Sequence, residues 1–146
     1  MTTELKNEIY ELRKNSKIAF ISSVDEDGCP TIKAMLVLEN ENLNTLYFST
    51  NLSAKRTQQF LKNPNAAVYL CETDQFKGLL LQGKIAVMTD SEHKSMLWRE
   101  GFEIYYPDGI ETEDYCVLKF IAEKGNYYHG LNNVSFSIQE VSQDGI

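Results

Sequence analysis

Hydrophobic residues recur along the chain with two different periods. Near the N-terminus, Leu5, Ile9 and Leu12 are separated by polar residues and fall on one side of a helix of about three turns. We expect this helix to cover one end of a core, and we expect Arg13→Ala on it to leave a site elsewhere unaffected. From residue 17 onward, short apolar runs alternate with polar turns, which is typical of β-strands.

The first three apolar runs span residues 17–24, 31–38 and 45–50, and turns of hairpin length separate them. Consecutive strands joined in this way usually pair with one another, so the pattern predicts an antiparallel meander.

The middle strand of this meander has two different faces, because side chains alternate along a strand. We expect its uniformly apolar face to fill a barrel: Ile32, Ala34, Leu36 and Leu38. Lys33, Met35 and Val37 share the other face and are expected to point outward. Apolar residues that flank a cation on an outer surface predict a contact with a second copy of the chain.

A polar, cationic stretch after the third strand predicts a helix over 53–62, which Pro64 terminates. Further strands are predicted at 66–72 and 78–89. Gly83 has no side chain to pack, and we expect it to mark a sharp bend at a barrel corner.

The last third of the chain predicts one more helix, which Asp90 caps and which runs through Trp98. Strands are predicted at 115–123 and 127–138, paired across a turn at 124–126. Many short strands with inserted helices predict a mainly β protein built around a small antiparallel barrel.

The length of 146 residues suits a single domain over 1–146. Acidic residues outnumber basic ones by 21 to 14, and the net charge of -7 argues against nucleic acid and anionic membrane surfaces as partners. The N-terminus lacks the apolar region of a signal peptide, and no apolar run approaches the ~18 residues of a membrane span. We therefore expect a cytoplasmic protein.

The three cysteines, Cys29, Cys71 and Cys116, are odd in number and widely spaced, which suits a reducing compartment better than a disulfide framework. His93 and His129 have no further ligands at metal spacing, so no metal site is expected. The sequence contains no nucleophile or phosphate-loop motif, and we assign no catalytic residue.

Polar side chains gather where the third strand passes into the following helix. They are Thr50, Asn51, Ser53, Lys55 and Arg56. With Lys33 on the neighbouring predicted strand and the free N–H groups of the helix start, they form a candidate phosphate site. The alternative is a capped surface helix with solvated cations, although cations at a helix N-terminus oppose the helix dipole.

The same stretch carries a resemblance to a known family. LYFSTNLSAKRTQQFLKNPNAAVYL, supported by PTIKAMLVL, GKIAVMTD and W…YYPDG, resembles the FMN-binding split barrels related to pyridoxamine 5′-phosphate oxidase, especially their short general-stress-protein-like bacterial members. The resemblance covers residues 16–122. It implies a small antiparallel split β-barrel, Greek-key-like, with flanking α-helices, which forms a homodimer with FMN at the subunit interface.

Nine residues match positions that bind FMN in this family. A cation on the second strand meets the phosphate, two neighbours contact the flavin through their backbone, and the end of the third strand lies beside the ribityl chain. The start of the next helix grips phosphate oxygens, and a tryptophan approaches the ring from the partner subunit. The cation on the second strand is Lys33, and its two neighbours are Ala34 and Met35. The end of the third strand comprises Ser49, Thr50 and Asn51, and the helix start comprises Ser53 and Lys55. The tryptophan is Trp98.

Two departures from the family pattern affect the functional expectation. Ala54 stands where the oxidase branch commonly has the first member of an Arg-Lys pair, which leaves Arg56 as a differently placed cation. The C-terminal segment also lacks the Arg/His-rich motif that holds the substrate phosphate in true vitamin B6 oxidases. We therefore expect negligible pyridoxamine 5′-phosphate oxidase activity.

The resulting hypothesis is an FMN-binding flavoprotein that acts as a flavin-dependent oxidoreductase on a small molecule, with NAD(P)H as a candidate electron donor. One alternative is a non-catalytic protein that stores or senses flavin under stress. Another is a split barrel that binds haem or a deazaflavin coenzyme.

Overall fold

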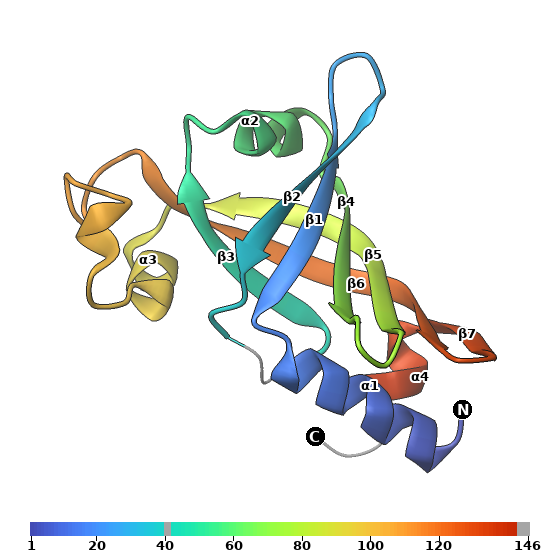
Figure 1. The fold of residues 1–146 in the computed structure, drawn as a ribbon. Coiled ribbons are helices and arrows are strands. Elements are labelled where there is room, and N and C mark those ends of the chain that lie inside the picture. The colour runs from blue at the N-terminus through green and yellow to red at the C-terminus, as the bar shows by residue number, and fades with distance from the viewer. Residues whose placement is uncertain (40–41, 143–146) are drawn as a thin grey trace.

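The computed structural model describes residues 1–39 and 42–142, and over these ranges it contains seven strands and four α-helices. The helices are α1 (Thr3–Asn15), α2 (Lys55–Lys62), α3 (Ser91–Leu97) and α4 (Ile138–Ser142), with a 3-10 turn η1 (Phe102–Ile104). The strands are β1 (Ile18–Val24), β2 (Pro30–Leu36), β3 (Thr45–Asn51), β4 (Asn65–Glu72), β5 (Lys77–Met88), β6 (Tyr115–His129) and β7 (Asn132–Ser137). All strand pairs are antiparallel, which confirms the predicted mainly β fold (Figure 1).

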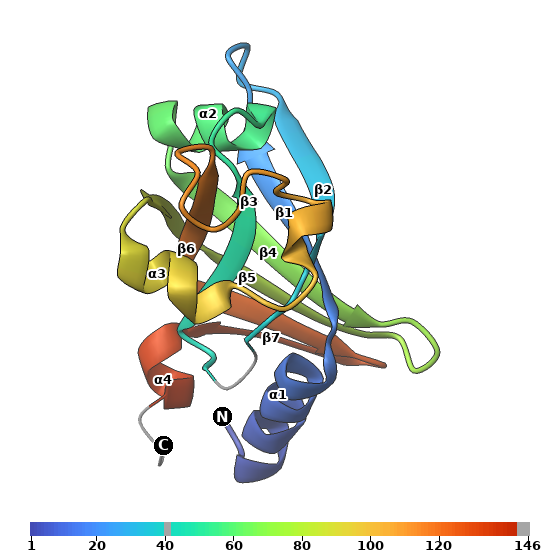
Figure 2. The same cartoon turned by 90° about the vertical axis from the view of Figure 1, so that its left-hand side faces the viewer.

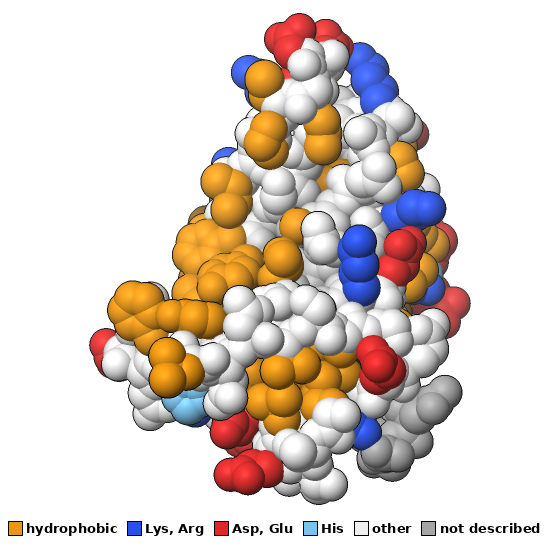
Figure 3. Space-filling model, turned by 90° about the vertical axis from the view of Figure 1, so that its right-hand side faces the viewer, with side chains coloured by type: hydrophobic (Ala, Val, Ile, Leu, Met, Phe, Trp, Pro, Cys, Tyr) orange, Lys and Arg blue, Asp and Glu red, His pale blue; other side chains and the backbone are white. Residues whose placement is uncertain are grey.

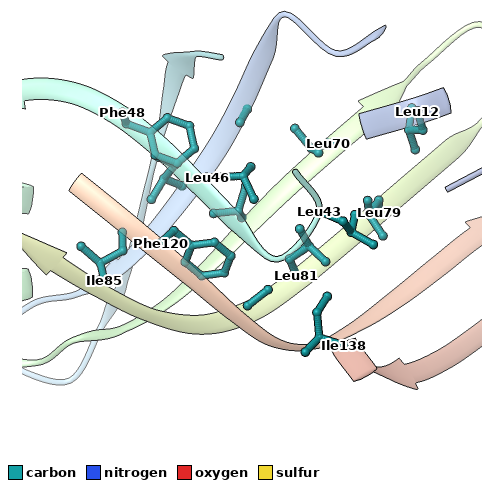
Figure 4. Packing of buried hydrophobic residues seen from close by; sticks show 14 of the residues in the cluster. Leu12, Leu43, Leu46, Phe48, Leu70, Leu79, Leu81, Ile85, Phe120 and Ile138 are labelled. Atoms are coloured by element: carbon teal, nitrogen blue, oxygen red, sulfur yellow. The ribbon is translucent and has the colours of Figure 1, made fainter. Parts of the chain in front are cut away.

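The sheet curls around a core of aliphatic and aromatic side chains, among them Leu46, Phe48 and Phe120, which point into the space between the strands (Figure 4). The predicted bend in β5 is confirmed, because the register with β6 shifts between Gln82 and Gly83. A Cβ atom on Gly83 would lie 2.0 Å from the carbonyl oxygen of Ile121, so only glycine allows the two strands to approach this closely.

The strand order is β2-β1-β4-β5-β6-β3, with β7 beside β6. Strands β2 and β3 therefore lie at opposite ends of this order, and β3 pairs with β6. The predicted meander was wrong at its third strand, because the partner that β3 adopts is distant in sequence. The barrel stays open between the free edges of β2 and β3.

Strand β2 has its two faces reversed relative to the prediction. Met35 is 8% exposed and belongs to the core, whereas Ile32 and Leu36 are 69% and 50% exposed. Ala34 is exposed as well. Lys33 lies opposite the buried Ile21 in the β1–β2 ladder, and directly opposed residues share a face. Both faces of the strand carry apolar residues, so alternation alone could not assign them.

The predicted turn at 124–126 was also wrong, because β6 runs without interruption from Tyr115 to His129. The chain reverses after it, at Gly130, which has a φ of 60°. Gly125 instead gives room to a neighbouring ring, since a Cβ there would lie 2.6 Å from Phe136. Beyond β7, the end of the predicted strand is the helix α4.

Helices close the two ends of the barrel. Helix α1 buries Ile9 and Leu12 at one end, as predicted, and α2 buries Phe60 at the other end (Figure 1). Helix α3 and the segment that follows it cover the outer side of β3 and β6, where they form a second hydrophobic cluster around Tyr115 (Figure 2). Among the described residues, no helix is both long enough and apolar enough to cross a membrane.

Candidate functional site

A cavity of about 390 Å³ lies between the open edges of β2 and β3. Residues from β2, from the end of β3, from α2 and from the segment around η1 contribute to its wall. They are Lys33, Ala34, Met35, Leu36, Leu38, Ser49, Thr50, Asn51, Arg56, Phe102, Tyr105 and Tyr106. The structure thus brings together six of the nine predicted cofactor-binding residues, from strands that do not pair with each other.

Arg56 is the cation that α2 directs toward this cavity. Its Nη2 atom donates a 2.7 Å hydrogen bond to Oγ1 of Thr50, which lies at the end of β3. Its Nε atom is buried, and no acceptor from the described part of the chain reaches it. Partial burial lowers the pKa of the guanidinium group, because the charged form loses hydration. A partly desolvated cation with an unused N–H group favours an anion as its partner.

Ser53 and Lys55 lie outside the cavity. They line a second cleft, of about 520 Å³, between α2 and the turn that joins β1 to β2. Asp25, Glu26 and Asp27 line the same cleft, and Lys62 pairs with Glu26 there at 2.6 Å, so acidic side chains outnumber cations around Lys55. The structure therefore separates the predicted phosphate cluster into two parts.

Part of this separation arises because the helix begins later than the sequence predicted. Helix α2 begins at Lys55 rather than at residue 53, and Ala54 is its N-cap, without a side chain that caps the helix. Because successive helical residues are rotated by about 100°, Lys55 and Arg56 point to different sides of the helix. Arg56 faces the cavity and Lys55 faces the second cleft.

Asp114 is a site-proximal residue that sequence reasoning missed. Its carboxylate accepts hydrogen bonds from the backbone N–H of Ser53 at 2.9 Å, from Oγ of Ser53 at 3.1 Å and from Nδ2 of Asn51 at 2.9 Å. These bonds, led by the one from the Ser53 backbone, lower the pKa of the Asp114 carboxyl group. No local signal identifies Asp114, because its partners lie more than sixty residues earlier in the chain.

Trp98 packs against aromatic residues of the cavity wall but does not line the cavity itself. Its ring packs edge-on against Tyr115 at 5.2 Å and against Phe102 at 5.6 Å, measured between ring centroids. Phe102 and Tyr106 form part of the wall itself. Burial is the main cause that raises the pKa of Tyr106 to about 12, so its phenol stays protonated near neutral pH.

The titratable side chains of the cavity wall are Lys33, Arg56, Tyr105 and Tyr106. The cavity wall therefore carries both cationic and aromatic side chains. Over the described residues, no three His, Cys, Asp or Glu side chains come together as metal ligands.

Sequence comparison identifies the family of this chain. Residues 4–143 match the model of the family described as pyridoxamine 5′-phosphate oxidase like. The chain belongs to this family. No curated protein sequence matches it.

Solved structures share the fold of this family member over nearly its whole length. A protein related to general stress protein 26 of Bacillus subtilis, from Clostridium acetobutylicum and described as of the pyridoxinephosphate oxidase family, is 39% identical, with a TM-score of 0.85 over 97% of this chain and 99% of that one. General stress protein 26 from Bacillus anthracis is 20% identical, with a TM-score of 0.74 over 92% and 100%. A pyridoxamine 5′-phosphate oxidase-related, FMN binding protein from Nostoc punctiforme is 12% identical, with a TM-score of 0.66 over 94% and 98%. The split-barrel fold expected from the sequence is therefore confirmed.

Proposed function

We propose that this family member binds FMN in the cavity between β2 and β3 and acts as a flavin-dependent oxidoreductase on a small molecule. The observation that carries the proposal is Arg56, a partly buried cation whose Nε atom has no acceptor among the described residues, in the wall of a cavity that also contains aromatic side chains. The family match and the FMN-binding description of one structural neighbour support a flavin as the ligand.

The phosphate of FMN would lie against the two cations of the cavity wall, Lys33 and Arg56. Arg56 offers its unused N–H group, Lys33 offers a second cation from the edge strand, and Thr50 holds the guanidinium group in place. Charge-assisted hydrogen bonds of this kind are roughly twice as strong as neutral ones. Riboflavin lacks the phosphate, so these contacts distinguish the two flavins.

The ring system fits the remaining wall. Met35, Leu38 and Phe102 supply apolar contacts, and a volume of about 390 Å³ lies within the range of ligand sites, roughly 300–1,000 Å³. Because β2 pairs only with β1, its free edge has backbone N–H and C=O groups that can meet the polar edge of a flavin. When bound, the flavin supplies the redox chemistry, while these residues hold it and exclude water.

We also propose that a second copy of the chain covers the outer face of β2 and β1, so that the flavin lies at a subunit interface. Ile32, Leu36 and Ile18 are exposed there, and Ile18 lies directly opposite Leu36 in the ladder. The same outer side continues toward the β4–β5 hairpin, where Figure 3 shows exposed hydrophobic side chains in patches. Exposed apolar surface of this extent marks an interaction site.

The assembly is tested by light scattering of the flavin-loaded protein. We expect a mass of two chains for the parent and of one chain for Ile32→Asp. Leu131→Asp, at an exposed apolar position on the turn after β6, is the matched control and should remain dimeric. A parent that is monomeric at micromolar concentration with flavin bound would contradict the dimer.

The absorption spectrum of the purified protein tests the cofactor. Two flavin bands are expected, one in the near ultraviolet and one in the visible range, whereas a Soret band indicates haem and a single band at shorter wavelength than the visible flavin band indicates a deazaflavin. Absence of flavin bands, together with no binding of added FMN, would refute the proposal.

Anaerobic mixing with NADH or NADPH then separates an oxidoreductase from a flavin store. The alternative that the protein only stores flavin is supported by the composition of the cavity wall, which contains no carboxylate, histidine or cysteine among its described residues. An oxidoreductase should bleach the flavin and regain the colour when an acceptor is added. A store should bind FMN without productive turnover, which would leave the redox part of the proposal wrong.

A further inference from the structure

The segment that joins β3 to α2 folds around Asp114. The backbone N–H of Leu52 donates to the carbonyl oxygen of Asp114 at 2.6 Å, and Ser53 and Asn51 donate three hydrogen bonds to its carboxylate. A backbone N–H, a hydroxyl and an amide that converge on one anion form the kind of donor set that also binds phosphate oxygens. In this chain a side-chain carboxylate occupies that donor set.

Asp114 lies one side chain away from the cavity wall. Asn51, which binds Asp114, lines the cavity, and the preceding residue Thr50 binds Arg56. A fixed negative charge therefore lies next to the part of the cavity wall that Thr50 and Asn51 form.

We infer that Asp114 determines how strongly the site distinguishes phosphorylated from unphosphorylated flavins, because its carboxylate engages the Asn51 amide, which lines the cavity and could serve a phosphate there, and opposes the phosphate charge. The inference rests on the proposed function. It explains in physical terms why Ser53, although it matches a phosphate-gripping position of the family, donates elsewhere in this chain. Asp114 weakens FMN binding and leaves riboflavin binding nearly unchanged.

A purely structural role for Asp114 predicts a different result. If the carboxylate only clamps the 51–53 turn, its loss should weaken both flavins alike, because both use the same ring and ribityl contacts. The ratio of the two dissociation constants therefore separates a selectivity role from a clamp.

The experiment measures the dissociation constants of FMN and riboflavin by flavin-fluorescence titration at fixed ionic strength. Asp114→Asn keeps an acceptor oxygen for Ser53 and removes the charge, while Asp114→Ala also frees the donors. Glu113→Gln is the matched control, since it removes the same charge from the exposed neighbouring residue. Circular dichroism checks that each variant is folded.

We expect the ratio of the riboflavin to the FMN dissociation constant to rise about 3- to 10-fold in Asp114→Asn, as removal of one charge near a phosphate predicts. The rise should be at least as large in Asp114→Ala, and Glu113→Gln should keep the parent ratio. An unchanged or lower ratio in folded Asp114→Asn would overturn the inference, even if Asp114→Ala fails to fold.

Inorganic phosphate gives a readout that does not depend on flavin. If the parent binds neither flavin, the proposed function fails, and the thermal unfolding midpoint in phosphate, compared with chloride at equal ionic strength, decides the inference. A phosphate-dependent rise in Asp114→Ala that is absent from the parent and from Glu113→Gln supports the occupied donor set. Equal midpoint shifts in the three proteins overturn it.

Discussion

Nη2 of Arg56 donates a 2.7 Å hydrogen bond to Oγ1 of Thr50, whose side chain is 1% exposed. This bond joins the first turn of α2 to the last residues of β3. A second bond, from Oγ1 of Thr57 to the carbonyl oxygen of Asn51 at 2.8 Å, joins the same two elements. The guanidinium group therefore keeps a fixed position at the cavity, which reduces the entropy that a phosphate ligand must remove on binding.

Arg56→Ala should weaken FMN binding far more than riboflavin binding. A charge-assisted hydrogen bond contributes ~1.5–3 kcal/mol, so the loss should be on the order of 10- to 150-fold in the FMN dissociation constant. Arg56→Lys keeps the charge but not the forked geometry and should lose less. Lys33→Ala should resemble Arg56→Ala, and the two effects need not add, because both cations would contact one phosphate.

The variant Lys55→Ala tests which of the two clefts binds the phosphate of FMN. The family resemblance implies a large loss of FMN affinity for this variant, whereas the position of Lys55 in the acidic second cleft leads us to expect a small one. Lys124→Ala, an exposed cation on β6, is the control and should match the parent. A large loss in Lys55→Ala with none in Arg56→Ala would move the phosphate to the second cleft.

The period of hydrophobic residues was sufficient to predict most strands and helices, because alternation and helical spacing are local properties of the chain. It could not assign the faces of β2, where Ile32 and Met35 are equally apolar and lie on opposite faces. It also could not predict that β3 pairs with β6, as in the pair of Thr50 with Cys116. Pairing of this kind is decided by how the whole sheet closes, which no short stretch encodes.

The candidate site, like the fold, could be predicted only in part from the sequence. Lys33, Thr50 and Asn51 line the cavity, and the polar cluster and the family resemblance both singled them out. The choice of Arg56 over Lys55 depends on where α2 begins, and a shift of two residues in a helix start changes which side chain faces the cavity. Asp114 was not predictable, because only the folded chain brings it to Ser53.

Gly83→Ala should destabilise the barrel strongly. Its Cβ would lie 2.0 Å from the carbonyl oxygen of Ile121, and a backbone atom cannot move aside as a flexible side chain can. Overpacking of this kind costs about 1–3 kcal/mol and sometimes more. Urea denaturation should show a lower midpoint, while Gln82→Ala, at the exposed preceding position, should stay close to the parent. Equal midpoints for the two variants would show that β5 and β6 can separate without loss.

Arg13→Ala should destabilise the protein, although the sequence suggested this variant as a neutral control. Arg13 is 1% exposed, and its guanidinium group donates to the carbonyl oxygens of Asn42 at 2.9 Å and Glu39 at 3.0 Å. Removal of a buried, charged donor costs about 2–4 kcal/mol. Asn7→Ala, at an exposed position of the same helix, should change the unfolding free energy by less than about 0.5 kcal/mol. If both variants unfold at the same urea concentration, the buried contacts of Arg13 contribute nothing.

The three thiols should react at very different rates in the folded protein. Cys29 is exposed, Cys71 is half-buried, and Cys116 is fully buried on β6 opposite Thr50. Burial is the main cause that raises the pKa of the Cys116 thiol to about 11, so at pH 8 its thiolate fraction is on the order of 100-fold smaller than that of an ordinary cysteine. Because the reactive form is the thiolate, the rate at Cys116 should rise with pH.

Iodoacetamide labelling at pH 8, followed by peptide mass spectrometry, measures the three rates in one sample. Cys29 should be modified first, and Cys116 should remain unmodified until denaturant unfolds the chain, when all three should react at similar rates. Cys29→Ser should leave the protection of Cys116 unchanged, because Cys29 lies in the turn before β2. Modification of Cys116 as fast as Cys29 in the folded protein would mean that the start of β6 opens readily, together with its pairing to Thr50, the residue that binds Arg56.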